Sequence, residues 1–189
     1  MRRCVPELIA DEVIYAGRRV TLIKRLLRVK GSVVAREVVR FGEAAAALPI
    51  LPDGKVILIK QFRAPINGWV LEIPAGVVEP GESPEETIKR ELVEEIGYEA
   101  GSLRKLFSIH TTPGYSDEIL HIYVAEDLKY VGARPEKYEV IETVVFKDVD
   151  EALNAVLSEP VADAKTLLTL LALKTGITDS QARHSKPCE

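Results

Sequence analysis

The sequence contains little cysteine and no long hydrophobic run. Only two of its 189 residues are cysteines, and Cys4 and Cys188 lie near opposite ends of the chain. Two such residues favour free thiols in a reducing compartment over a disulfide framework, although the sequence leaves one bond between them open. The longest apolar runs, residues 44–51 and 167–173, are much shorter than the ~18 residues of a membrane span. A disulfide-rich scaffold and a helical membrane protein are therefore excluded.

The chain also lacks an export signal and an excess of positive charge. Its start, Met1–Arg3, is typical of a signal peptide, but proline and acidic residues within 6–12 interrupt any apolar stretch, so we expect a cytoplasmic protein. The net charge of −4 argues against non-specific binding of nucleic acid. With 47% hydrophobic residues, the chain suits one compact domain with a small appendage.

The hydrophobic pattern predicts a mixed α/β chain. Short bursts of Val, Ile and Leu between turn residues predict strands, and apolar residues three to four positions apart predict helices. The predicted strands are 13–16, 19–29, 33–41, 44–51, 55–62, 69–73, 103–110, 119–124 and 140–146. The predicted helices are 83–96, 149–157 and 162–174. A Pro-Asp-Gly turn at 52–54 predicts a hairpin between its two flanking strands.

Charge is unevenly distributed along the chain. Residues 18–40 contain eight basic residues and one acid, whereas residues 72–99 contain nine glutamates and two basic residues. This division suits an anionic ligand bound beside a cation site. For most of the basic residues, a solvated strand face is the better interpretation.

The helix predicted over 83–96 carries a cluster of carboxylates. Ser83 and Glu86 form a capping-box pattern at its start, and Gly97 follows its end. At 100° per residue, three glutamates lie on one face next to the apolar stripe: Glu91, Glu94 and Glu95. Their mutual repulsion needs an offset, and Mg²⁺ with oxygen ligands is the simplest candidate. A solvated acidic face is the alternative for the cluster taken alone.

These glutamates belong to a longer pattern between residues 76 and 98. The segment fits G-x5-E-x7-R-E-U-x-E-E-x-G-U without a gap, where U is bulky and apolar or aromatic. The matching residues are Gly76, Glu82, Arg90, Glu91, Leu92, Glu94, Glu95, Gly97 and Tyr98. With each residue type used at about 7%, its seven fixed positions agree by chance less than about once in 10⁷ starts. In this pattern the chain resembles the Nudix hydrolases, which cleave a nucleoside diphosphate linked to another group.

The resemblance implies a fold and a domain organisation. We expect a Nudix α/β/α sandwich with a mixed sheet over residues 43–176 and a polar tail over 177–189. Residues 61–65, residues 71–76 and Pro113 resemble the ADP-ribose pyrophosphatase branch of the family. In that branch the N-terminal β domain, here residues 1–42, swaps across a homodimer axis and helps to build the partner's site.

The resemblance also assigns metal ligands and signature residues. Glu91 and Glu95 are the expected principal ligands of Mg²⁺, or of Mn²⁺, and Glu94 either assists or ligates a further ion. The backbone carbonyl of Ala75 is a further expected ligand. Two signature residues, Glu82 and Arg90, are expected to tie the loop after Gly76 to the helix by an ion pair.

Substrate residues and a general base follow from the same branch. Arg63 is expected to bind the diphosphate, Arg36 to reach the substrate from the neighbouring subunit, and Glu72 to lie near the metals or the ribose. Glu139 is the expected base that takes a proton from the attacking water. Glu136 and Glu142 are its rivals.

The expected reaction is Mg²⁺-dependent hydrolysis of ADP-ribose to AMP and ribose 5-phosphate. Other nucleotide sugars or dinucleotides, such as NADH or a diadenosine polyphosphate, are alternative substrates; Tyr115 favours the last of these, and Pro113 outweighs it. A Nudix domain kept only as a ligand sensor is a further alternative, which the intact carboxylate cluster disfavours. We expect neither a nucleic-acid nor a membrane partner.

Overall fold

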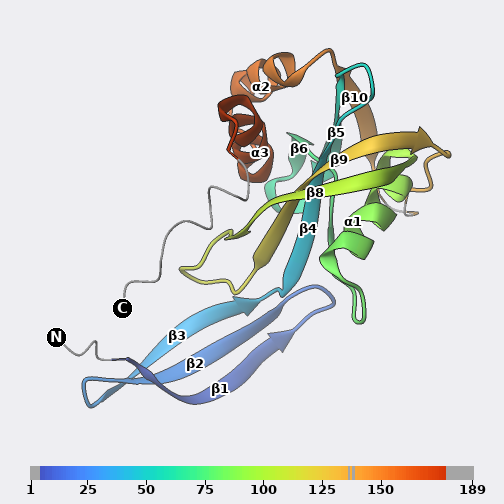
Figure 1. The fold of residues 1–189 in the computed structure, drawn as a ribbon. Helices are drawn as coiled ribbons and strands as arrows, with labels where there is room; N and C mark the ends of the chain where they lie inside the picture. Colours follow the sequence, from blue (N-terminus) through green and yellow to red (C-terminus); the bar gives the residue numbers. More distant parts are fainter. Residues whose placement is uncertain (1–4, 136, 138, 178–189) are drawn as a thin grey trace. The chain divides into compact units, whose positions relative to one another are not determined.

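The computed structural model describes residues 5–135, 137 and 139–177, and the chain forms two compact units (Figure 1). Met1–Glu43 and Ile109–Leu120 make up the first unit, and Ala44–Ser108 and His121–Glu189 make up the second. The segment 109–120, expected in the Nudix domain, thus groups with the N-terminal strands. Both cysteines, and all of the predicted tail except Ile177, lie outside the described residues.

The first unit is a three-stranded antiparallel sheet in the order β1-β2-β3. Its strands are β1 (Glu7–Ala16), β2 (Thr21–Val29) and β3 (Ser32–Arg40). Asp11 on β1 accepts two hydrogen bonds of 2.9 Å from Arg25 and one of 2.6 Å from Arg40. Part of the basic segment is therefore paired with an acid of β1. The loop of the segment 109–120 joins this unit through Val39, whose N–H donates to the carbonyl of Tyr115 at 2.7 Å.

Two sheets form the framework of the second unit, in the orders β10-β5-β6 and β7-β4-β9-β8. The strands are β4 (Glu43–Pro49), β5 (Val56–Arg63), β6 (Gly68–Glu72), β7 (Ala75–Val77), β8 (Tyr98–His110), β9 (Ile119–Tyr130) and β10 (Ile141–Phe146). The expected α/β fold class is confirmed. The three-residue strand β7 was not predicted, because it carries no periodic pattern.

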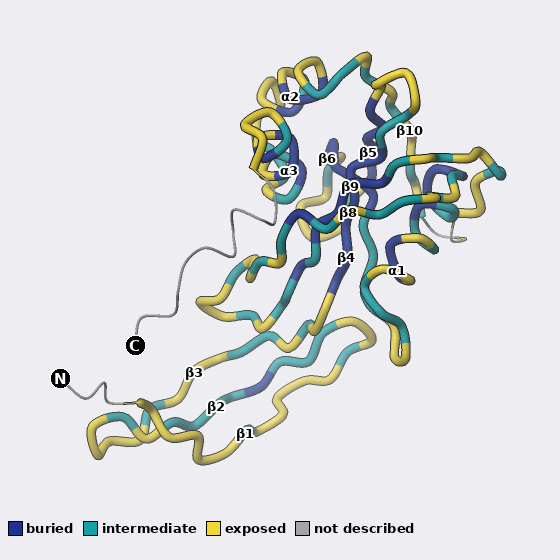
Figure 2. Tube along the Cα trace, viewed as in Figure 1, coloured by how far each residue is buried: buried dark blue, intermediate teal, exposed yellow. Residues whose placement is uncertain are grey.

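The predicted hairpin between β4 and β5 is wrong. The turn forms, with the N–H of Leu51 donating to the carbonyl of Lys55 at 2.8 Å, but only one bridge, Ile50 to Val56, joins the two strands. Beyond it they separate into different sheets. Residues 44–49 of β4 and residues 56–59 of β5 are apolar and buried on both faces (Figure 2), so these parts of the strands are flanked by other strands and covered on both faces.

The helices are α1 (Pro84–Glu91), α2 (Val149–Ser158) and α3 (Ala164–Thr175), and α1 continues into a π-helical turn, η2 (Leu92–Ile96). The capping box at Ser83 and Glu86 is present, and Gly97 ends the turn with a φ of 78°. Within the second unit, α1 lies on one side of the strands and the α2–α3 pair on the other (Figure 1). In the described part of the chain, no helix combines the length and apolar character that crossing a bilayer requires.

The core of the second unit lies between α1 and the strands. Ile88, Leu92 and Ile96 pack against Ile57 and Ile59 of β5. All five are almost completely buried. This packing fixes the face of α1 and η2 that carries the signature carboxylates.

Candidate active site

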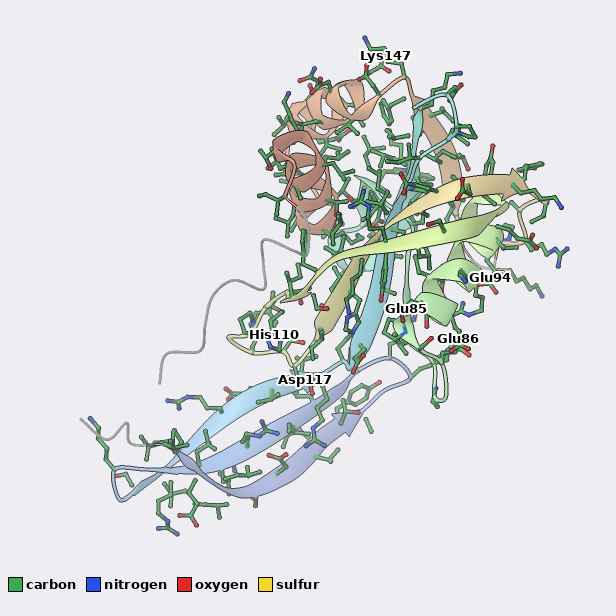
Figure 3. The ribbon with its side chains drawn as sticks, in the orientation of Figure 1. Glu85, Glu86, Glu94, His110, Asp117 and Lys147 are labelled. Carbon is green, nitrogen blue, oxygen red and sulfur yellow. The ribbon has the colours of Figure 1, made fainter. Side chains whose placement is uncertain are left out.

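The three signature glutamates lie where α1 changes into the π turn. Glu91 is the last residue of α1, and Glu94 and Glu95 belong to η2. In Figure 3, Glu85 and Glu86 mark the start of this helix and Glu94 its far end. Single π turns inside α-helices occur often at functional sites, because the extra residue changes which side chains share a face.

Gly76 lies directly against the carboxylate of Glu91. A Cβ built on this glycine would be 1.9 Å from Glu91 Oε1 and 2.2 Å from its Cδ. Only a residue without a side chain lets the loop approach so closely. The first glycine of the signature therefore makes room for a carboxylate that is expected to bind metal.

Arg90 donates hydrogen bonds to several glutamates of the signature. Its Nε and Nη2 donate to Glu82 at 3.0 and 3.2 Å, and its Nη1 donates to Glu91 at 2.7 Å and Glu94 at 2.9 Å. The expected ion pair between loop and helix is thus present. Hydrogen bonds from Arg90 and Thr87 lower the pKa of Glu82 to about 2, and the same Arg90–Glu82 pair raises the pKa of Arg90.

Glu95 is the most buried acid of this cluster, with only 4% of its surface exposed. Its Oε2 accepts one hydrogen bond, from the backbone N–H of Ala75 at 3.2 Å. Burial raises the pKa of Glu95 to about 9, and the charges of Glu91 and Glu139 add to this effect. Burial also raises the pKa of Glu91, which Arg90 opposes. Binding of a cation would favour the ionised form of both carboxylates.

The donor set fits a hard divalent cation. Carboxylate oxygens from Glu91, Glu94 and Glu95, beside the backbone of Ala75, are the ligand type that Mg²⁺ prefers. Across residues 5–135, 137 and 139–177, no three His, Cys, Asp or Glu side chains are grouped as ligands of one ion. Glu91 and Glu94 turn instead to Arg90. Each of these two carboxylates has a second oxygen that takes no part in its hydrogen bond to Arg90.

Arg63 and Glu72 form an ion pair across β5 and β6, in which Arg63 ends β5 opposite Gly68 and Glu72 ends β6 opposite Ile59. Arg63 donates from Nε to Glu72 Oε1 at 2.7 Å and from Nη2 to Oε2 at 2.9 Å. The Glu72 side chain is 1% exposed, whereas that of Arg63 is 35% exposed. Glu72 therefore orients Arg63, whose Nη1 group makes neither of these two bonds. The expected place of Glu72 near the metals or the ribose stays a prediction.

Lys165 is a site residue that the sequence interpretation missed. Its Nζ donates to Glu72 Oε2 and, at 3.1 Å, to Asp163 Oδ1. Asp163 also caps α3, and the Oγ1 of Thr166 accepts from the backbone N–H of Ile73 at 2.8 Å. The N-terminus of α3 is thereby fastened to the chain just after β6. No local pattern could have indicated a contact across 93 residues.

Glu139 lies within electrostatic reach of the carboxylate cluster, since its charge acts on the pKa of both Glu91 and Glu95. Hydrogen bonds fix the chain on both sides of it. Before it, the N–H of Arg134 donates to the carbonyl of Glu94 at 3.0 Å, and after it the carbonyl of Val140 accepts from Phe62 at 3.2 Å.

The other two candidate bases are placed differently. Glu142 pairs in register with Lys60 and is exposed, one position on from the part-buried Ile141. Successive strand residues face opposite sides, so Glu142 points away from the face of Ile141. Glu136 lies outside the described residues.

Arg36 lies in the first unit, whereas the other expected site residues belong to the second. It is exposed on β3 opposite Arg25, and its Nη1 donates to the adjacent carbonyl of Ala35 at 2.7 Å. Its expected contact with the substrate of a neighbouring subunit stays a prediction.

Comparisons with known proteins give one family for this chain. Residues 40–170 match the model of the NUDIX domain. The chain is 38% identical over 177 residues to an ADP-ribose pyrophosphatase of Bacillus subtilis, covering 92% of this chain and 95% of the relative. It is also 38% identical over 148 residues to a GDP-mannose pyrophosphatase of Yersinia enterocolitica, covering 71% and 75%.

A solved structure is similar over nearly the whole chain. It is the crystal structure of an ADP compounds hydrolase, with a TM-score of 0.80, 26% identity and coverage of 94% of this chain and 96% of that one. The signature, the carboxylate cluster and these similarities agree. The chain belongs to the Nudix family of hydrolases.

Proposed function

We propose that the protein hydrolyses the pyrophosphate bond of ADP-ribose to AMP and ribose 5-phosphate. The observation that carries this is the gathering of Glu91, Glu95 and Glu139 near Arg63, whose charge acts on Glu95. Similarity to a named ADP-ribose pyrophosphatase over 92% of the chain supports the choice of substrate.

The residues supply distinct parts of the reaction. Glu91, Glu94, Glu95 and the Ala75 carbonyl would hold Mg²⁺, or Mn²⁺, which lowers the charge of the diphosphate and activates its phosphorus. Arg63 binds a diphosphate oxygen through Nη1, because Glu72 already holds Nε and Nη2. Glu139 takes a proton from the attacking water as the bond from phosphorus to the bridging oxygen breaks.

We also propose that the protein is a cytoplasmic homodimer. Exposed apolar side chains on β1 support the dimer, since Leu8, Val13, Ile14 and Tyr15 are 56 to 63% exposed. A cluster of this kind on a small sheet is typical of a protein contact surface. In this arrangement Arg36 of β3 reaches the diphosphate bound by the neighbouring subunit.

A second candidate is hydrolysis of another nucleotide sugar. The similarity to a GDP-mannose pyrophosphatase favours it, because the metal and phosphate residues do not select the base or the sugar. NADH and diadenosine polyphosphates are less favoured substrates of the same chemistry. A catalytically inactive ligand sensor would bind ADP-ribose without cleaving it.

A coupled phosphate assay separates these functions. ADP-ribose, GDP-mannose, NADH and diadenosine tetraphosphate are each incubated with enzyme, Mg²⁺ and a phosphatase that attacks only terminal phosphates. We expect the highest kcat/KM with ADP-ribose, and no release with EDTA. A higher kcat/KM for GDP-mannose would support the second candidate, and stabilisation by ADP-ribose without phosphate release would support the sensor.

A further inference from the structure

Gln61 of β5 carries a buried acceptor without a partner. The residue is 5% exposed, and in the described part of the chain its Oε1 is the only fully buried side-chain nitrogen or oxygen without a hydrogen bond. An unpaired buried acceptor destabilises a folded protein, so one that persists needs an explanation. Nothing in the metal or phosphate sites described above accounts for it.

The strand directs Gln61 toward the carboxylate site. Side chains alternate along a strand, so Ile57, Ile59, Gln61 and Arg63 share one face of β5. Ile57 and Ile59 pack on the apolar stripe of α1 and η2. Two residues beyond Gln61, Arg63 lies close enough to Glu95 for each charge to act on the other. Gln61 therefore lies between the packed core and the phosphate-binding arginine.

The neighbouring strand brings the proposed base to the same place. Gln61 pairs in register with Ile141 of β10, and directly paired residues share a face. Glu139 precedes Ile141 by two positions, and its charge reaches Glu91 and Glu95. The amide of Gln61 is thus flanked by Arg63 along its own strand and by the segment of Glu139 across the sheet.

We propose that Gln61 positions the attacking water. This inference rests on the proposed hydrolysis. Water has two hydrogens, and fixing the direction of its lone pair requires an acceptor for each. Glu139 accepts the hydrogen that leaves as a proton, and Gln61 Oε1 accepts the other. The water oxygen bonds to phosphorus, the bond to the bridging oxygen breaks, and the hydrogen held by Gln61 stays on the new phosphate.

The variant Gln61→Met tests this assignment, with Leu58→Met as matched control. Leu58 is fully buried on the opposite face of the same strand, so the control receives the same side chain away from the site. We expect Gln61→Met to lower kcat about 10- to 100-fold, the range of a lost positioning contact, with KM and the Kd of a methylene-bridged ADP-ribose analogue unchanged. Its Tm should not fall below that of the control, because the deleted oxygen had no partner.

Competition between methanol and water as nucleophiles gives a product ratio that would stay the same if Gln61 had only a structural role. Methanol has one O–H, which Glu139 accepts, and therefore no hydrogen for Gln61. In water–methanol mixtures the ratio of methyl ester to hydrolysis product should rise in Gln61→Met by about 10- to 100-fold, the same factor as the loss in kcat. This ratio does not depend on how much of the variant is folded, since both products come from the same active molecules.

The outcomes separate this inference from the proposed function. If wild type fails to cleave ADP-ribose, the proposed substrate is wrong, and the same ratio is measured with the nucleotide that it does cleave. If wild type is active while Gln61→Met keeps kcat within twofold and an unchanged product ratio, the assignment of Gln61 is overturned and the hydrolase stands.

Discussion

The ionised form of Glu95 destabilises the metal-free fold, although the same ionised form is expected to bind the metal. A carboxyl whose pKa is raised on folding, here to about 9, is neutral at pH 7 in the protein without metal. Ionising it destabilises the fold, so the stability of metal-free protein should fall as pH rises from the ordinary value of 4.5 toward 9. A bound cation reverses this, because it favours the ionised form.

Glu95→Gln should therefore separate the two properties. We expect turnover to be lost, since an amide cannot replace a carboxylate ligand, while the Tm of metal-free protein at pH 8.5 rises by several degrees. About 1 kcal/mol moves the Tm of a domain of this size by roughly 2–4 °C. Differential scanning calorimetry at pH 6 and 8.5 measures it, and a variant that is destabilised at pH 8.5 would contradict this view of Glu95.

Gly76→Ala should displace Glu91 from its place. The added Cβ would overlap a carboxylate oxygen at 1.9 Å, so the side chain or the loop has to move. We expect a loss in kcat/KM of about 100-fold or more, as is found when catalytic groups shift by an ångström. Gly114→Ala is the control, because a Cβ there meets nothing within 4 Å. Equal activity of both variants would show that a glycine at position 76 is not needed to keep the Glu91 carboxylate in place.

Glu139→Gln should lower kcat by roughly 10²–10⁴ if this residue is the general base, with little change in KM. Glu142→Gln is the matched control on the same segment, and we expect it to stay within twofold of wild type. Steady-state kinetics with ADP-ribose measure both. The reverse order of effects would transfer the role of base to Glu142.

Among secondary-structure elements, α1 was the easiest to predict. Its capping box, apolar stripe and terminal glycine are all local signals, and the structure keeps each of them. The π turn over Leu92–Ile96 was not predictable, since it depends on packing against β5 and on the loop held by Gly97. The separation of β4 from β5 was missed for a related reason, because the turn at 52–54 gives no information on later partners.

The stability of the protein should change with pH through the ionisation of Glu82 in the signature loop. Its pKa is lowered on folding to about 2, so the ion pair with Arg90 stabilises the protein fully above pH 4.5 and is lost as pH falls toward 2. We expect the Tm of wild type to drop from pH 5 to pH 3, and that of Glu82→Gln to drop less. Parallel curves for the two proteins would mean that this pair contributes little to stability.

For the complete chain, the local sequence pattern and the family resemblance predicted different features. The carboxylate face of α1 follows from spacing alone, whereas the roles of Arg63 and Glu139 came from resemblance. Neither source indicated Lys165 or the orphan amide of Gln61, because both depend on strands and helices that meet only after folding. The grouping of residues 109–120 with the N-terminal sheet also needed three-dimensional contacts.

The exposed apolar residues of β1 bear on assembly. If they form a dimer contact, the double substitution Val13→Asp and Tyr15→Asp should give a monomer, because burying two carboxylates there is unfavourable. Light scattering coupled to size exclusion measures the mass. A variant that stays dimeric and fully active would show that the contact lies elsewhere.

The proposed hydrolysis depends most on Glu91, Glu94 and Glu95 binding a divalent cation beside a diphosphate. Crystals soaked with Mn²⁺ and a methylene-bridged ADP-ribose analogue test this directly by anomalous scattering. We predict a peak in contact with the carboxylates of Glu91 and Glu95 and with a diphosphate oxygen. A bound analogue with no peak at these carboxylates would contradict the account.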